Sequence, residues 1–447
     1  MMLQDFMIPI TILSFICTIA FIIFRPNVNE SIPATVGAIF VLLSGSVTIH
    51  DVGKITETIG GAAVTIMATI VMAIVLESFG FFNWAAEKLL ERAKGSGIRL
   101  FWYTNLFCFL MTLFVNNDGS ILITTPILLM LLHQLGLKNH QKIPYLLSGA
   151  LVATASSAPI GVSNIVNLIA LKIVHMDLYM QTAMMFVPAS LGLVLLTLLL
   201  FFSFYRVLPR KLAPIKVGAL HQTHPLQDIS SPIPIENRTK FMRNILIFVF
   251  SVRISLFVAS FIHFPVPLMA VIGSTFLLGW RWYYLKIAPT DMIRKMPWYI
   301  LVFAFSMYVI IYGLHNIGLT QMLIQLMQPL VSGSLLDASL MMGVLLTILS
   351  NLFNNHPALM VGTLTLTNMG LDPLTLKISY LAGVIGSDMG SLILPIGTLA
   401  TIMWMHIIKK GKVKLSWAEY LKVTITVIPI TLIFTLVILA FWVSWIF

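Results

Sequence analysis

Two short polar tripeptides interrupt long apolar stretches of this sequence. Asn116-Asn117-Asp118 and Asn354-Asn355-His356 lie 238 residues apart, and each follows a run of mainly apolar residues. Amide, carboxyl and imidazole groups donate and accept hydrogen bonds, so they suit a polar solute or a proton. Polar backbone breaks at membrane depth persist only where they line a cavity or are buried in protein. We therefore expect all six residues to contribute to a binding site.

Two further pairs of matching residues lie at nearly the same spacing. Pro159-Ile160-Gly161 recurs as Pro395-Ile396-Gly397 after 236 residues, and Gly80 recurs as Gly318 after 238 residues. Proline removes a backbone donor and glycine permits unwinding, so each Pro-Ile-Gly predicts a broken helix. Duplicated breaks of this kind are typical of the binding site of a secondary transporter.

Three polar residues follow the breaks at positions that could face the cavity: Ser163, Asn164 and Thr398. An unwound backbone would turn their side chains towards a solute, and the helix that begins there would add unpaired N–H groups. The alternative is that they satisfy backbone groups freed by the break. Capping is likewise the alternative for Asn117, Asp118 or Asn355, although each tip has two asparagines and one cap needs one residue.

Only three acidic residues lie well inside apolar sequence, namely Glu77, Asp118 and Asp388. A carboxyl group inside the membrane is a functional candidate because its charge is costly there. Asp388, seven residues before the second Pro-Ile-Gly, is the leading candidate for a proton carrier, and Asp118 and His356 are further candidates. The alternative for Asp388 is an ion pair with Arg253, the only basic residue deep in a predicted span.

The composition indicates a protein with many membrane spans. Mean hydropathy is +0.96, and 58% of the residues are hydrophobic. The net charge of +11 does not indicate nucleic acid, because the basic residues fall in short loops between apolar segments. Cys17 and Cys108 are too few for a Cys-ligated metal cluster within one chain. Since no nucleotide-binding or nucleophile motif occurs, we expect no enzyme, no cofactor and no metal held by fixed ligands.

The pattern of apolar segments predicts an all-α polytopic membrane protein with ten spanning helices and two re-entrant hairpins. The predicted spans are 6–24, 34–49, 60–80, 144–171, 184–205, 243–262, 265–284, 298–313, 376–408 and 421–447. The hairpins, about 100–136 and 336–371, have arms of roughly 25 Å, short for a hydrocarbon core of about 30 Å. The first repeat would be 1–205, a cytoplasmic connecting loop 206–242, and the second repeat 243–447.

The distribution of basic residues predicts the orientation. With the N-terminus outside, every Lys and Arg falls in an inner loop except Lys54, Lys172, Lys377 and Arg253. Each half then has five spans and one hairpin. An odd number of spans makes the second half enter from the opposite face, so the repeats would have inverted topology, with both broken helices at the midplane and both termini outside.

The sequence resembles the arsenite/antimonite efflux permease family of the ion transporter superfamily over nearly its whole length. The matching stretches are ESFGFFNW (77–84), NDGSILITTP (117–126), SNIVN (163–167), NNHP (354–357), GVIGSD (383–388) and LPIGTLATIMW (394–404). One departure concerns the second tip, where this chain has His356 in place of the Met that we associate with the family. That difference adds a titratable group.

The resemblance implies a multi-pass protein of the bacterial cell membrane. It would export As(III) and Sb(III) as neutral hydroxides in exchange for protons, in some cases with a soluble arsenite-stimulated ATPase as partner. Its other partners would be membrane lipid, arsenite, antimonite and protons. One proton moving inward through about 100 mV and one pH unit releases roughly 3.7 kcal/mol, enough for a gradient of a few hundredfold in a neutral solute.

Two other functions fit the same residues. A sodium/proton or carboxylate exchanger of the same superfamily could use the carboxyl groups and asparagines for a cation, and the helix N-termini for an anion. A passive membrane subunit of an ATPase-driven metalloid pump is the second alternative, since the chain has no nucleotide motif of its own.

Overall fold

The computed structural model describes residues 2–25, 28–212 and 238–447, and these residues form helices and connecting turns without strands. The first half contains α1 (Met2–Phe24), α2 (Ser31–Leu43), α3 (Ile49–Ser78), α4 (Phe81–Ala93), α5 (Gly97–Phe114), α6 (Asn117–Gln134), α7 (Asn139–Ala155), the 3-10 turn η1 (Gly161–Ser163), α8 (Ile165–Ile173) and α9 (Leu178–Phe204). The second half contains α10 (Arg238–Phe261), α11 (Val266–Leu285), α12 (Asp291–Lys295), α13 (Tyr299–Asn316), α14 (Leu319–Val331), α15 (Leu335–Phe353), α16 (Asn355–Thr367), α17 (Pro373–Asp388), η4 (Gly390–Ile393), α18 (Leu399–Lys410) and α19 (Trp417–Ile446).

The two halves repeat the same order of elements from α4 and α14 onward. Both of these helices have 13 residues and begin after a glycine in the left-handed region, Gly80 with φ 74° and Gly318 with φ 98°. A residue with a side chain is strained at such φ values, which explains why glycine occupies both positions. Each half then continues with a helical hairpin, a broken helix and a long final helix.

Both predicted breaks are present. α7 ends at Ala155 and α8 begins at Ile165, while α17 ends at Asp388 and α18 begins at Leu399. In each gap the backbone forms one 3-10 turn rather than an α-helix. The segments 144–171 and 376–408 are therefore broken helices, as the Pro-Ile-Gly motifs predicted.

The early helices differ from the predicted spans. α2 has only 13 residues, about 20 Å, and the predicted segment 34–49 is divided by the turn before α3. α3 begins at Ile49 because Thr48 and Asp51 form a capping box, in which each side chain accepts the other residue's backbone N–H. α10 begins at Arg238, inside the predicted connecting loop 206–242, of which 213–237 lie outside the described residues.

Eight of the described helices are long and apolar enough to cross a membrane: α1, α3, α5, α9, α10, α13, α15 and α19. They include the first arms of both predicted hairpins, α5 and α15. The chain is thus an all-helical multi-pass membrane protein, and the division into ten spans and two hairpins stays a prediction.

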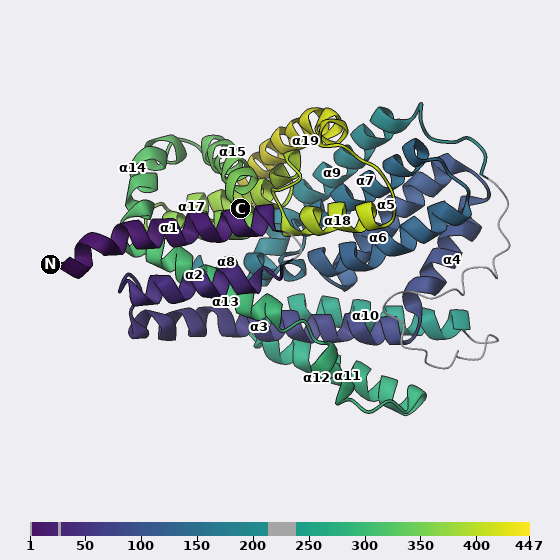
Figure 1. Ribbon diagram of the computed structural model, residues 1–447, viewed down its shortest axis with the longest axis horizontal. Coiled ribbons are helices and arrows are strands. Elements are labelled where there is room, and N and C mark those ends of the chain that lie inside the picture. The colour runs from purple at the N-terminus through teal and green to yellow at the C-terminus, as the bar shows by residue number, and fades with distance from the viewer. Residues whose placement is uncertain (1, 26–27, 213–237) are drawn as a thin grey trace.

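The two hairpins lie in opposite halves of the molecule. In Figure 1, α4, α5 and α6 lie at the right, and α14 and α15 lie at the left. α17 lies beside α14 and α15 on the left, α8 lies near the centre, and α18 lies beside α6 on the right. α3 crosses most of the picture and packs against α11 of the other half. This arrangement brings the broken helices of both halves into the interior.

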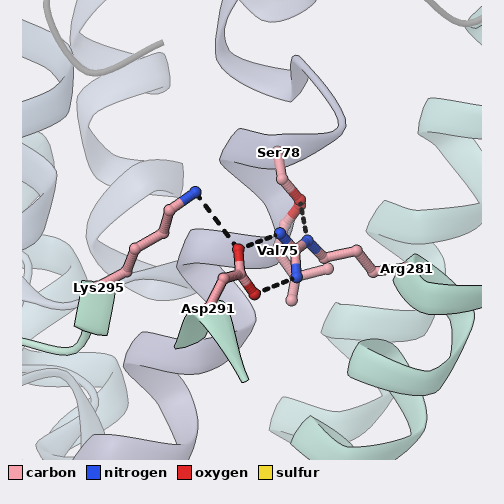
Figure 2. A network of polar contacts seen from close by, with 5 residues as sticks. All are labelled: Val75, Ser78, Arg281, Asp291 and Lys295. Carbon is pink, nitrogen blue, oxygen red and sulfur yellow. Dashed lines mark hydrogen bonds and ion pairs between the residues drawn. The ribbon is translucent and has the colours of Figure 1, made fainter. Parts of the chain in front are cut away.

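A partly buried ion pair joins α11 to α12, and its arginine also bonds to the end of α3. Figure 2 shows Arg281 of α11, which is 1% exposed, with its guanidinium donating to both carboxylate oxygens of Asp291 at 2.8 and 2.6 Å. Its Nε donates to Ser78 Oγ at 3.0 Å, and Lys295 lies 3.4 Å from the same carboxylate. The bidentate geometry makes this pair a specific connection between α3, α11 and α12.

This pair predicts a particular pH dependence of stability. The hydrogen bonds from Arg281 hold the pKa of Asp291 below its ordinary value. The stabilisation is therefore complete above about pH 4 and is lost as the pH falls through the lowered pKa. We expect Asp291→Asn to lower the Tm by a constant amount from about pH 8 to 5, and the difference from wild type to shrink below pH 4. A difference that widens with acidification would contradict this assignment.

Candidate functional site

Each hairpin tip uses the first of its two asparagines as a helix cap. Asn116 Oδ1 accepts the N–H of Gly119 at 2.7 Å at the start of α6, and Asn354 Oδ1 accepts the N–H of His356 at 3.4 Å at the start of α16. The alternative role of Asn117, Asp118 or Asn355 was to cap these helices, but the residues that cap them are Asn116 and Asn354. The second residue of each pair is thereby released from capping.

The first tip carries unpartnered polar atoms. Asn117 is buried, and neither its Oδ1 nor Asp118 Oδ1 has a hydrogen-bond partner in the structure. A buried carbonyl or carboxylate oxygen without a partner is costly unless water or a ligand binds it. The first tip is thus equipped to accept hydrogen bonds from a solute.

The second tip is tied to the second broken helix. The N–H of Asn355 donates to Gly397 O at 2.9 Å, and Asn354 Nδ2 lies 3.5 Å from Ile396 O. His356 is buried, with its Nδ1 2.9 Å from Asn355 Oδ1 and its ring edge-on to Phe303 at 5.8 Å. The structure therefore gives His356 a hydrogen-bond partner inside its own tip, and Asn355 Nδ2 is left without one.

Asp388 connects the two halves of the chain. It is fully buried at the end of α17, and among the described residues the donors to its carboxylate all belong to the first half. Ser157 Oγ donates to Oδ2 at 2.7 Å, Asn167 Nδ2 donates to Oδ2 at 2.8 Å, and Asn164 Nδ2 donates to Oδ1 at 3.2 Å. A second link lies two turns earlier, where Tyr380 Oη donates to Asn167 O at 3.0 Å. The first break is therefore built around a carboxylate of the second half.

The other predicted residues of the breaks have different surroundings. Thr398 Oγ1 accepts the N–H of Thr401 at 3.0 Å and caps α18, so it satisfies a freed backbone group. Asn164 does both things that the sequence allowed. Its Oδ1 accepts the N–H of Val166 and caps α8, and its Nδ2 donates to Asp388. Ser163 Oγ is buried and has no hydrogen-bond partner.

The sequence matches a known family over almost its full length. The family model described as "Arsenical pump membrane protein" covers residues 10–443. This chain belongs to the arsenical pump membrane protein family. The resemblance seen in the motifs is thereby confirmed.

Individual members of the arsenical pump family show the range of similarity. A putative arsenical pump membrane protein of Bacillus subtilis (strain 168) is 60% identical over 97% of this chain and 100% of its own length. An arsenical pump membrane protein of Escherichia coli is 30% identical over 95% of this chain and 97% of its own length. Among solved structures, the YdaH transporter of Alcanivorax borkumensis aligns with a TM-score of 0.53 at 15% identity, over 89% of this chain and 90% of that one, which shows a similar fold.

In this arsenical pump family member, the structure does not have the ion pair that was the alternative role for Asp388. Arg253 does not pair with Asp388. Its Nη2 donates to the carbonyl oxygens of Phe114 and Val115 at 2.9 and 3.2 Å, immediately before the first tip. Arg253 lies on α10, and these carbonyls lie at the end of α5, where the helix dipole is negative. The end of α5 therefore binds one nitrogen of the guanidinium, while the buried Nε and Nη1 have no hydrogen-bond partner.

Two residues that contact Asp388 were missed from the sequence. Asn167 lies three residues after Asn164, so both side chains project from one face of α8. That spacing was a usable signal. Ser157 gave none, because it is one of several small residues before the first Pro-Ile-Gly, and only the three-dimensional fold brings it to α17.

Proposed function

We propose that this chain exports trivalent arsenic and antimony, as neutral hydroxides, in exchange for protons. Membership of the arsenical pump family supports the substrate, and the surroundings of Asp388 support the coupling. In this proposal Asn116, Asn117, Asp118, Asn354, Asn355 and His356 form the tips, Ser163, Asn164 and Thr398 line the breaks, and Asp388 carries the proton.

The hydrogen bonds of Asp388 carry the proposal, because they differ between its two protonation states. An ionised carboxylate only accepts, and it suits the three donors that surround it. A protonated carboxyl must also donate, and the amide groups of Asn164 and Asn167 cannot accept at nitrogen. Protonation therefore changes the hydrogen bonds that link the two halves, and it needs a partner that can accept.

Ser157 is the partner that can reverse its role. Its hydroxyl has a single hydrogen and lies 2.7 Å from both Asp388 Oδ2 and Thr154 O. When Asp388 is ionised, the hydroxyl donates to the carboxylate. When Asp388 is protonated, it can accept from the carboxyl and donate to Thr154 instead. The serine would thus allow a proton to be bound without leaving a buried donor unpaired.

We further propose that the halves are inverted repeats that move by alternating access. The paired breaks and the hairpins in opposite halves of Figure 1 support this. A neutral hydroxide fits a site of amide, hydroxyl and backbone groups, since these offer both donors and acceptors. The two cysteines, Cys17 and Cys108, are too few for a three-thiolate arsenic site. No ATPase is needed for transport in this scheme, although a soluble partner could still associate.

Purified protein in liposomes tests the function. We expect arsenite and antimonite to accumulate when a pH gradient drives protons out through the protein, with the voltage clamped, and to equilibrate without accumulation when the gradient is collapsed. Sodium-dependent proton movement with no response to arsenite would instead show a sodium/proton exchanger. Downhill arsenite flux that no proton gradient can turn into accumulation would indicate a passive subunit.

A further inference from the structure

The two breaks are supported differently by the helices that pack on them. At the second break, α19 contributes two hydroxyl groups. Tyr420 Oη donates to Leu392 O at 2.9 Å, and Thr424 Oγ1 donates to Ile393 O at 2.8 Å. Asn351 of α15 completes the support, donating to Gly390 O and accepting from the N–H of Leu394. The neighbouring helices thus satisfy the backbone that the second break exposes.

At the first break, α9 takes the place of α19 but forms no such bond. Its Gln181 is 1% exposed, and neither the Oε1 nor the Nε2 of its amide has a hydrogen-bond partner. The amide lies directly against Gly161, and a Cβ at that position would overlap it. Each break also has one buried serine hydroxyl without a partner, Ser163 and Ser391. The unsatisfied amide is therefore the feature by which the first break differs.

An unsatisfied buried amide is unfavourable for folding alone. A side-chain amide without partners costs more than an apolar group of the same shape, and such groups are few in native proteins. In the second half, the equivalent helix α19 donates the hydroxyl groups of Tyr420 and Thr424 to the backbone of the break. The same fold can therefore place a polar side chain here with its hydrogen bonds made. A bound molecule that pairs with the amide would account for its retention at the first break.

We propose that Gln181 and Ser163 of the first break form part of the binding site for the neutral hydroxide substrate. A metalloid hydroxyl group both donates and accepts, and so matches one amide that offers an N–H and a C=O. Gly161 has no side chain, so the amide of Gln181 reaches the unwound backbone. This assignment rests on the proposed transport of arsenite.

The test is Gln181→Leu, which keeps similar volume and removes both unpartnered atoms. We expect the KM for arsenite uptake in liposomes to rise about tenfold or more, as for the loss of one or two hydrogen bonds. The maximal rate should change little, and the Tm without substrate should be unchanged or higher. A structural role for the amide predicts the opposite, namely a lower Tm with an unchanged KM.

The matched control is Thr424→Val at the second break, which leaves Ile393 O without its donor. We expect it to lower the Tm and leave the KM unchanged.

Ser163→Ala is the second test variant, and we expect a rise of a few-fold in its KM with little change in the Tm. Wild-type protein that takes up no arsenite would overturn the proposed function itself. Wild-type uptake with an unchanged KM in Gln181→Leu and Ser163→Ala would overturn only the assignment of this binding site.

Discussion

Asp388→Asn is expected to lower proton-driven arsenite uptake in everted membrane vesicles by at least about 100-fold, a loss typical of removing an essential proton-transfer group. Asparagine has nearly the same shape but cannot bind a proton at neutral pH. Its own N–H2 would also face the amide donor of either Asn164 or Asn167, so the new side chain cannot reproduce all three hydrogen bonds. The readout is uptake at fixed voltage as a function of the pH difference.

The matched control for this prediction is Asp372→Asn on the same helix. Asp372 is exposed at the start of α17, where its carboxylate caps the N–H groups of Leu374 and Thr375. Asparagine caps helices about equally well, so uptake should stay near the wild-type value. If Asp388→Asn keeps the same dependence on the pH gradient as Asp372→Asn, Asp388 is not the proton carrier.

Arg253→Gln is expected to have the second largest effect, a loss of at least about tenfold in uptake. Arg253 is 5% exposed, and its guanidinium holds the last carbonyl groups of α5 directly before Asn116. The shorter glutamine does not reach both carbonyls, and leaving buried carbonyl groups unpaired costs about 1–3 kcal/mol each. The first tip would then be less well positioned.

The control lies on the same helix, at Arg243. This residue is exposed on α10, so Arg243→Gln should leave uptake nearly unchanged. Uptake and the Tm should be measured for both variants, because a positioning role predicts that Arg253→Gln lowers the rate even at temperatures where it remains folded. Uptake by Arg253→Gln within about twofold of that by Arg243→Gln would show that the contact does not matter for transport.

Much of the architecture was predictable because it depends on local chemistry. The combination of proline and glycine at 159–161 and 395–397 favours unwound backbone, and the structure has both breaks there. Gly80 and Gly318 were found as a matched pair by spacing alone, and both prove to precede a 13-residue helix. The length of α3 was underestimated because its first turns, from Ile49, are polar, and a capping box rather than hydropathy sets its start.

The partners of the charged residues could not be predicted from the sequence. A pair of Asp388 and Arg253 was the alternative that the sequence offered, as an acid and a base inside apolar segments. In three dimensions the base lies against helix-terminal carbonyls and the acid lies against two amides and a hydroxyl. Neutral polar residues outnumber charged ones in a membrane protein sequence, so many of them could be the partner of a buried carboxylate. No charge pattern in the sequence marked Ser157 and Asn167, which lie 231 and 221 residues before Asp388, as its partners.

The hydrogen bonds of Asp388 join the two halves of the chain, and this has a consequence for protein engineering. The acceptor belongs to one half of the chain, and Ser157, Asn164 and Asn167 belong to the other. If the proposed proton coupling holds, a chimera that joins the amino-terminal half of one relative to the carboxy-terminal half of another would have to inherit all four residues to keep it. The substrate preference of such a hybrid should follow its amino-terminal parent, which supplies Ser163 and Gln181.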